Sequence, residues 1–282
     1  MKRLIISAIM LLSVASCTKK YVLPDDPSSI DEGRTEVTAS VEDYIGQKFV
    51  WTASTRIGIY DSEGHSNRRY TLKNEYLDSS GEVSLYGSTI GGTAVAYLPY
   101  TEKGYPCVAE FRQPVLAAQK AGASAIRHLA LNTVLVARGD GNGRFAFSYE
   151  ANNVGLIHLT VMADVDGLVD KVVIHSPGAP LAGNVSMLGD ADPRVTEGSQ
   201  YLTLTDVGRP CTDESPLEVW AQVPSGEFSH LTITLLSEGN VTTAVYEGSL
   251  KVPSGGAVSA VAERVANQAG NDDLTIIDGS YQ

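Results

Sequence analysis

Two neighbouring stretches decide the fold: RFAFSYE at residues 144–150 and GLIHLTVMA at residues 155–163. Aromatic residues occupy every second position of the first stretch, and aliphatic residues occupy every second position in the middle of the second. Successive side chains of a β-strand point to opposite faces, so alternation of this kind predicts half-buried strands.

The same period-2 pattern recurs along most of the chain, in short runs separated by Gly, Pro, Asn and Asp. We therefore predict an all-β protein built of two β-sandwiches. The further runs are Val37/Ala39/Val41, Ile57/Ile59, Val95/Tyr97, Val172/Ile174, Leu202/Leu204, Leu217/Val219/Ala221, Leu231/Ile233/Leu235 and Val258/Ala260/Ala262.

Turn signals refine this prediction. Asp166-Gly167 and Glu238-Gly239-Asn240 lie where hairpin turns are expected. The Ala-rich stretch from Val115 to Ala137 contains Gly122 and small residues, which favour a loop with at most one helical turn.

The length of 282 residues suits about two domains. The glycine-rich stretch at residues 139–143 is the best boundary between them. We therefore expect one sandwich over residues 35–140, a second over residues 141–268, and a C-terminal tail over residues 269–282.

The N-terminus has the pattern of an export signal. Two basic residues precede an apolar run of about ten residues and a small-residue cleavage region, which together predict a signal peptide over residues 1–16. Val14-Ala15-Ser16-Cys17 resembles the lipobox of bacterial lipoproteins, in which the Cys carries the acyl chains. Residues 17–34 are polar and broken by prolines, which is typical of a tether.

Composition argues against several classes of function. Lys+Arg 21 against Asp+Glu 33 gives a net charge of −12, which is unsuited to binding nucleic acid. The five histidines lie far apart, and no Cys or Glu stands at metal-ligand spacing from them. We therefore expect no metal, no cofactor and no enzymatic activity.

From Trp51 to Met187 the order of features resembles the fimbrillin family of bacterial lipoproteins. The matching pieces occur in the same order as in that family and together cover about half the chain. They are Trp51 with Arg56-Ile57-Gly58-Ile59-Tyr60, Ala96-Tyr97-Leu98-Pro99-Tyr100, Phe111-Arg112-Gln113, Phe145-x-Phe147, Ile157-x-Leu159-x-Val161, and Val172-x-Ile174 leading to Leu181-Ala182-Gly183.

The resemblance implies two transthyretin-like sandwiches and a pilus subunit or pilus-associated adhesin, lipid-anchored at the outer membrane and displayed at the cell surface. Its partners would be other pilin subunits and a host or bacterial surface ligand. In family pilins an Arg-specific protease removes the lipidated segment, and a strand from a neighbouring subunit fills a groove.

Two places in this sequence suit that scheme. Cleavage after Arg34 would free Thr35 as the new terminus, although Arg34 also reads as an ordinary solvated residue. In the tail, Leu274 and Ile276 share one face of a short β-prone run, and Ile277 lies on the other. This run is a candidate donor strand; folding back on its own domain and fraying are the alternatives.

A second function stays open: a monomeric outer-membrane lipoprotein that binds carbohydrate, with Trp51, Trp220 or tyrosines as stacking platforms. Export also permits one disulfide, between Cys107 and Cys211. The alternative is that both cysteines are small, inert residues.

Overall fold

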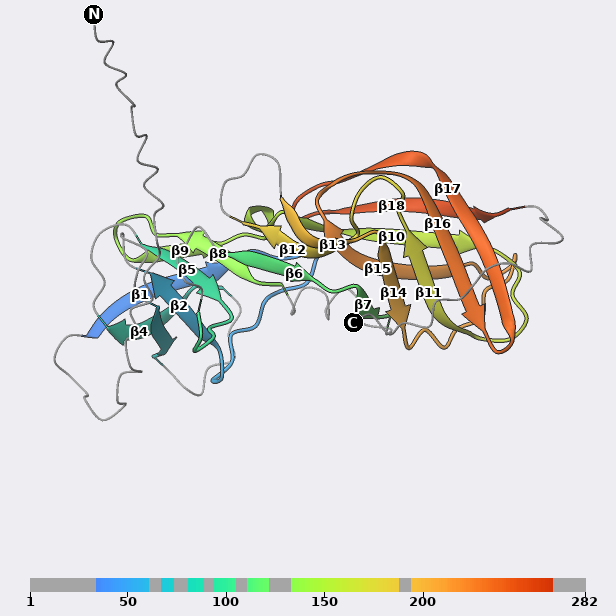
Figure 1. Cartoon of the computed structure of the whole chain (residues 1–282). Helices are drawn as coiled ribbons and strands as arrows, with labels where there is room; N and C mark the ends of the chain where they lie inside the picture. Colours follow the sequence, from blue (N-terminus) through green and yellow to red (C-terminus); the bar gives the residue numbers. More distant parts are fainter. Residues whose placement is uncertain are drawn as a thin grey trace, which may run out of the picture.

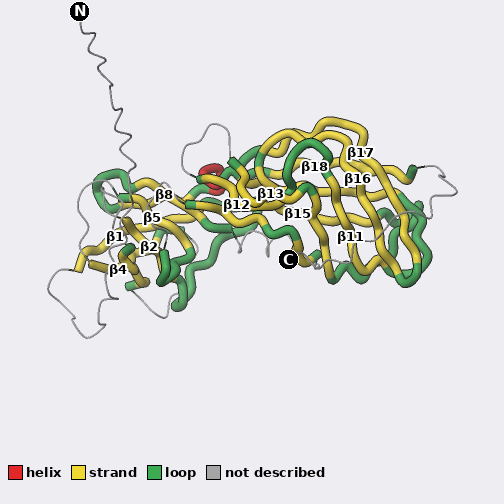
Figure 2. Tube along the Cα trace, viewed as in Figure 1, coloured by secondary structure: helices red, strands yellow, loops and turns green. Residues whose placement is uncertain are grey.

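The computed structural model describes residues 34–60, 67–73, 81–88, 94–104, 111–121, 133–187 and 194–265. Within these ranges the regular elements are β-strands and one 3-10 helix, η2 (Tyr149–Asn152), with no α-helix. Figure 1 shows the strands gathered into two bodies placed end to end, and Figure 2 shows how completely strands dominate both. The predicted all-β architecture is confirmed. No helix in the described ranges is long and apolar enough to cross a membrane.

The first body is one sheet of seven strands. They are β1 (Arg34–Val41), β2 (Arg56–Tyr60), β3 (Arg68–Leu72), β4 (Val83–Ser88), β5 (Val95–Leu98), β8 (Leu135–Arg138) and β9 (Arg144–Phe147). Their order is β8-β5-β2-β3-β4-β1-β9. Bridges from Val136 to Ser148 and from Gly139 to Phe145 join the two end strands, so the sheet closes into a barrel.

The second body is a sheet of eight strands. They are β7 (Ala118–Lys120), β10 (Val154–Met162), β11 (Val169–His175), β14 (Tyr201–Thr205), β15 (Leu217–Pro224), β16 (Gly226–Ser237), β17 (Asn240–Val252) and β18 (Ala257–Arg264). Their order is β15-β10-β18-β17-β16-β11-β14-β7. The predicted last strand at the end of the second half is present as β18, parallel to β10 and antiparallel to β17.

A side chain closes this second sheet between its end strands, β7 and β15. The carboxamide of Gln119 donates from Nε2 to the carbonyl of Gln222 at 2.7 Å, and its Oε1 accepts from the Gln222 N–H at 2.9 Å. The side chain of Gln222 donates in turn to the hydroxyl of Thr133 at 2.7 Å. The side chain of Gln119 thus forms the two hydrogen bonds with Gln222 of β15 that the backbone of a neighbouring strand would otherwise form.

The sheets do not divide at the glycine-rich stretch. Asp140 accepts hydrogen bonds from the N–H groups of Asn142 at 2.7 Å and Arg144 at 3.1 Å, which makes the stretch a tight turn between β8 and β9 of the first barrel. The predicted boundary at residue 140 therefore falls inside the first sheet, which continues to Phe147.

Strands from the first half of the chain also pair with strands from the second half. The small third sheet has the order β13-β12-β6, with β6 (Arg112–Val115), β12 (Ala182–Ser186) and β13 (Val195–Ser199). β6 and β7 precede β8 in the sequence, yet they pair with β12 and β14 respectively. The stretch predicted as a loop from Val115 to Ala137 thus holds β7 and most of β8; residues 122–132 within it lie outside the described residues.

One of the two predicted hairpin turns is confirmed. Glu238 and Gly239 connect β16 to β17, whose pairing continues to Ser237 opposite Asn240, and Gly239 has the positive φ of +78° that such turns favour. The prediction for Asp166-Gly167 is wrong. That turn joins β10 to β11, which are not partners, because β11 pairs with β14 and β16 instead.

Each body has its own apolar core, and the cores touch. The first core is rich in aromatic residues such as Trp51, Tyr70 and Phe145, whereas the second is mostly aliphatic. Leu156 and Trp220, both from strands of the second sheet, pack against the first core. The junction between the two bodies is therefore a packed contact.

Candidate functional site

The predicted maturation site lies at the first residue that the structure describes. Arg34 begins β1, and the strand pairs Arg34 with Ser88 and Thr35 with Gly87. β1 lies inside the first sheet, between β4 and β9. Cleavage after Arg34 would therefore leave residues 35–41 in the sheet and remove only the chain before them. Cys17 and the tail residues Leu274, Ile276 and Ile277 lie outside the described residues.

The two tryptophans predicted as stacking platforms differ in exposure. Trp51 is fully buried, donates from Nε1 to the carbonyl of Gly81 at 3.0 Å, and meets the ring of Phe49 edge-on. That interpretation of Trp51 is wrong, because no face of its ring is open. Trp220 is half-buried and stacks on His158 with ring centroids 4.2 Å apart.

The described polar residues do not assemble a metal site. No group of three His, Cys, Asp or Glu side chains in the described ranges could hold a metal ion. His158 lies 3.8 Å from Glu218, and His230 lies 2.9 Å from Glu247 at an exposed position. These contacts are isolated pairs on the outer surface of the second sheet.

Cys211 is a free thiol in the second core. It is fully buried, and its Sγ lies 3.3 Å from the carbonyl oxygen of Ala163 and 3.4 Å from that of Val161. The predicted alternative of a small, inert residue therefore describes Cys211. Cys107 lies outside the described residues.

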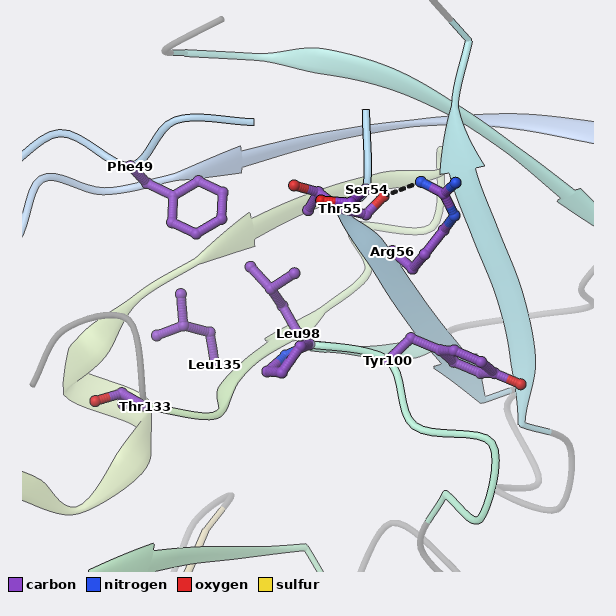
Figure 3. A pocket seen from close by; sticks show the side chains of 9 residues that line it. Phe49, Ser54, Thr55, Arg56, Leu98, Tyr100, Thr133 and Leu135 are labelled. Atoms are coloured by element: carbon purple, nitrogen blue, oxygen red, sulfur yellow. Dashed lines mark hydrogen bonds between the residues drawn. The ribbon is translucent and has the colours of Figure 1, made fainter. Parts of the chain in front are cut away.

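A cavity of about 280 Å³ opens at one end of the first barrel (Figure 3). The turn before β2, the end of β5 and the start of β8 build it. Phe49, Leu98 and Leu135 supply apolar walls, while Thr55 and Arg56 supply polar groups at the rim. Sequence reasoning missed this site because its residues come from segments spread over positions 49–135.

Arg56 is the charged residue that lines this cavity. Its Nη1 donates to the carbonyls of Ala53 and Thr55, the latter at 2.8 Å, which Figure 3 marks with a dashed line. The carbonyl of Arg56 itself accepts from the N–H of Tyr100 at 3.0 Å, which ties the turn to the end of β5. Burial raises the pKa of Tyr100, so its phenol is neutral near pH 7.

No protein-family model and no curated protein matches the chain. Solved structures do match by shape. A candidate cell adhesion protein from Bacteroides ovatus has a TM-score of 0.50 at 17% identity, covering 81% of this chain and 91% of its own. The tip fimbrial protein Mfa3 from Porphyromonas gingivalis, with a C-terminal truncation, has a TM-score of 0.40 at 9% identity, covering 77% and 83%. The chain thus shares its fold with the protein from Bacteroides ovatus.

Proposed function

We propose that this chain is a fimbrial or fimbria-associated adhesion subunit, anchored at the outer membrane by acylation of Cys17 and displayed at the cell surface. The observation that carries the proposal is the fold, which matches a candidate cell adhesion protein over 81% of the chain. The lipobox at residues 14–17 supports the anchor, because several acyl chains on one residue hold a protein stably on a membrane.

Release from the anchor would occur after Arg34. The described fold begins at that residue, so cleavage there separates the tether from a barrel that keeps all its strands. Residues 35–41 stay paired between β4 and β9. In this scheme the protease frees the subunit from the membrane without opening the first sheet.

Assembly would then proceed by strand addition at an edge that already exists, and β15 offers one. The N–H and carbonyl of Gln222 point away from β10, because both bond to Gln119. Residues two apart in a strand share this direction, so the backbone groups of Glu218 and Trp220 also point away from β10. Among the described residues none donates to or accepts from those groups. Unpaired edge groups of this kind can accept an added strand.

The strand that adds would be the tail of a second copy, through Leu274 and Ile276. Ile276→Asp should block polymer growth and leave the monomer folded, because a carboxylate would enter the apolar interface. Thr275→Asp is the matched control, since it places the same charge on the opposite face. Negative-stain microscopy and size-exclusion chromatography measure assembly, and a thermal melt measures folding. Polymers formed by Ile276→Asp as well as by the unchanged chain would contradict the donor role.

A further inference from the structure

The cavity at the end of the first barrel is lined by a cation, Arg56, that has no counter-ion among the residues the structure describes. The chain carries 33 acidic against 21 basic residues, so carboxylates are abundant. Nevertheless, no carboxylate of the described residues forms an ion pair with Arg56, although five other pairs occur there. A guanidinium that lies beside apolar walls and pairs with no described carboxylate can bind an anionic group of a ligand.

The guanidinium is also fixed in place before any ligand arrives. Its Nη1 is held by the carbonyls of Ala53 and Thr55. A hydrogen bond of 2.8 Å from the N–H of Thr55 to the carbonyl of Thr52 closes the turn that carries those carbonyls. Holding a long side chain in one conformation lowers the entropy lost on binding.

This arrangement leaves a defined set of donors. Arg has five N–H groups, and the two on Nη1 meet the two carbonyls. The N–H groups of Nε and Nη2 have no acceptor among the described residues. Nε–H and one Nη2–H point in parallel and form the fork that binds both oxygens of a carboxylate.

The rest of the cavity suits a small ligand that is partly apolar and partly hydroxylated. Phe49 and Tyr100, which are both half-buried, can contact the C–H face of a sugar ring. The hydroxyls of Ser54 and Thr55 lie at the rim beside Arg56, where both bond to the hydroxyl of Thr52 (Figure 3). The volume of about 280 Å³ is near the lower end for ligand pockets, about 300 Å³. It therefore suits one sugar residue and not a long oligosaccharide.

We propose that this cavity binds an acidic sugar residue of a surface glycan, with its carboxylate on the Nε and Nη2 donors of Arg56. The inference rests on the proposed adhesion function and names the chemical class of its ligand. Uronic acids and sialic acids share this chemistry.

To test this, the purified full-length chain is titrated with small sugars, and NMR or calorimetry measures their binding. The probes are methyl glucuronide and N-acetylneuraminic acid, and methyl glucoside serves as the probe without a carboxylate. We expect at least one acidic sugar to bind, tenfold or more tightly than methyl glucoside, and more weakly as salt is added.

Variants locate the site. Arg56→Gln should weaken binding about tenfold, the effect of one charge-assisted contact. Arg264→Gln, the same change at an exposed position on β18, should leave it unchanged. Ser54→Trp changes an exposed rim residue and should block the cavity without disturbing the core, so it tests the site even if Arg56→Gln fails to fold.

Three results would overturn the inference: no binding of either acidic sugar, equal binding of methyl glucoside, or undiminished binding by Ser54→Trp. Binding of N-acetyl-aspartate amide as tightly as the sugars would instead assign the cavity to acidic peptides and also overturn it. The titration uses the unassembled chain, so an absence of sugar binding can be distinguished from an absence of polymer formation.

Discussion

Replacing Gln119 by Ala removes the one side chain that closes the second sheet. Gln119 makes three hydrogen bonds to backbone groups, two with Gln222 and one from Nε2 to the carbonyl of Leu116 at 3.0 Å. Gln119 is 7% exposed and Gln222 is 4% exposed, so water does not readily replace these bonds. The variant leaves the N–H and carbonyl of Gln222 without partners.

The expected cost follows from those two groups. Each buried backbone group that loses its partner costs about 1–3 kcal/mol, which gives about 2–6 kcal/mol for the pair. Freeing the Gln side chain from one conformation returns up to about 2 kcal/mol. We therefore predict that the free energy of unfolding of the second body falls by up to about 4 kcal/mol, with about 2 kcal/mol at the middle of the range.

Urea unfolding measures the loss, and hydrogen exchange at the Gln222 amide locates it. Lys120→Ala is the matched control at the next residue. It removes an exposed ion pair of 3.4 Å with Asp206 and should cost less than about 1 kcal/mol. The reasoning fails if the two variants lose equal stability, or if the Gln222 amide stays protected in Gln119→Ala.

Two further changes test the first barrel and the anchor. Gly58→Ala should destabilise the first barrel by about 1–3 kcal/mol or more, since the added Cβ would lie 2.0 Å from the ring of the buried Tyr97. Gly178→Ala, which meets no atom within 4 Å, is its control in a thermal melt, and equal melting temperatures would refute the packing argument. Cys17→Ala should abolish labelling by a fatty-acid analogue and release the protein from membranes. Label retained in that variant would place the anchor elsewhere.

Local patterns predicted the strands because burial in a strand repeats every two residues. The runs around Phe145, Ile157 and Leu231 all became strands with one buried face. The turn at Gly239 was equally predictable, because only two residues separate its strands.

Long-range pairings were not predictable from the sequence. Gln119 and Gln222 are 103 residues apart, and no local signal marks a side chain that will replace a backbone partner. The glycine-rich stretch at residues 139–143 misled for a related reason: glycines serve tight turns and linkers alike, and only the contacts of Asp140 distinguish the two. Trp51 was mistaken for a surface residue because a single tryptophan carries no periodicity.

The candidate cavity was not predictable either, because it also depends on long-range strand pairing. Phe49, Arg56, Leu98 and Leu135 meet only because β2, β5 and β8 lie side by side in the order of the first sheet. The sequence singled out Arg56 within the fimbrillin-like stretch, but only the fold shows that none of the described carboxylates pairs with it.

Arg-specific proteolysis of the purified full-length chain tests the proposed subunit function most directly. Microscopy should show polymers after treatment and none before it, and N-terminal sequencing of those polymers should give Thr35 as the first residue. A chain that stays monomeric after complete cleavage at Arg34, or polymers whose subunits still begin at Cys17, would contradict the account.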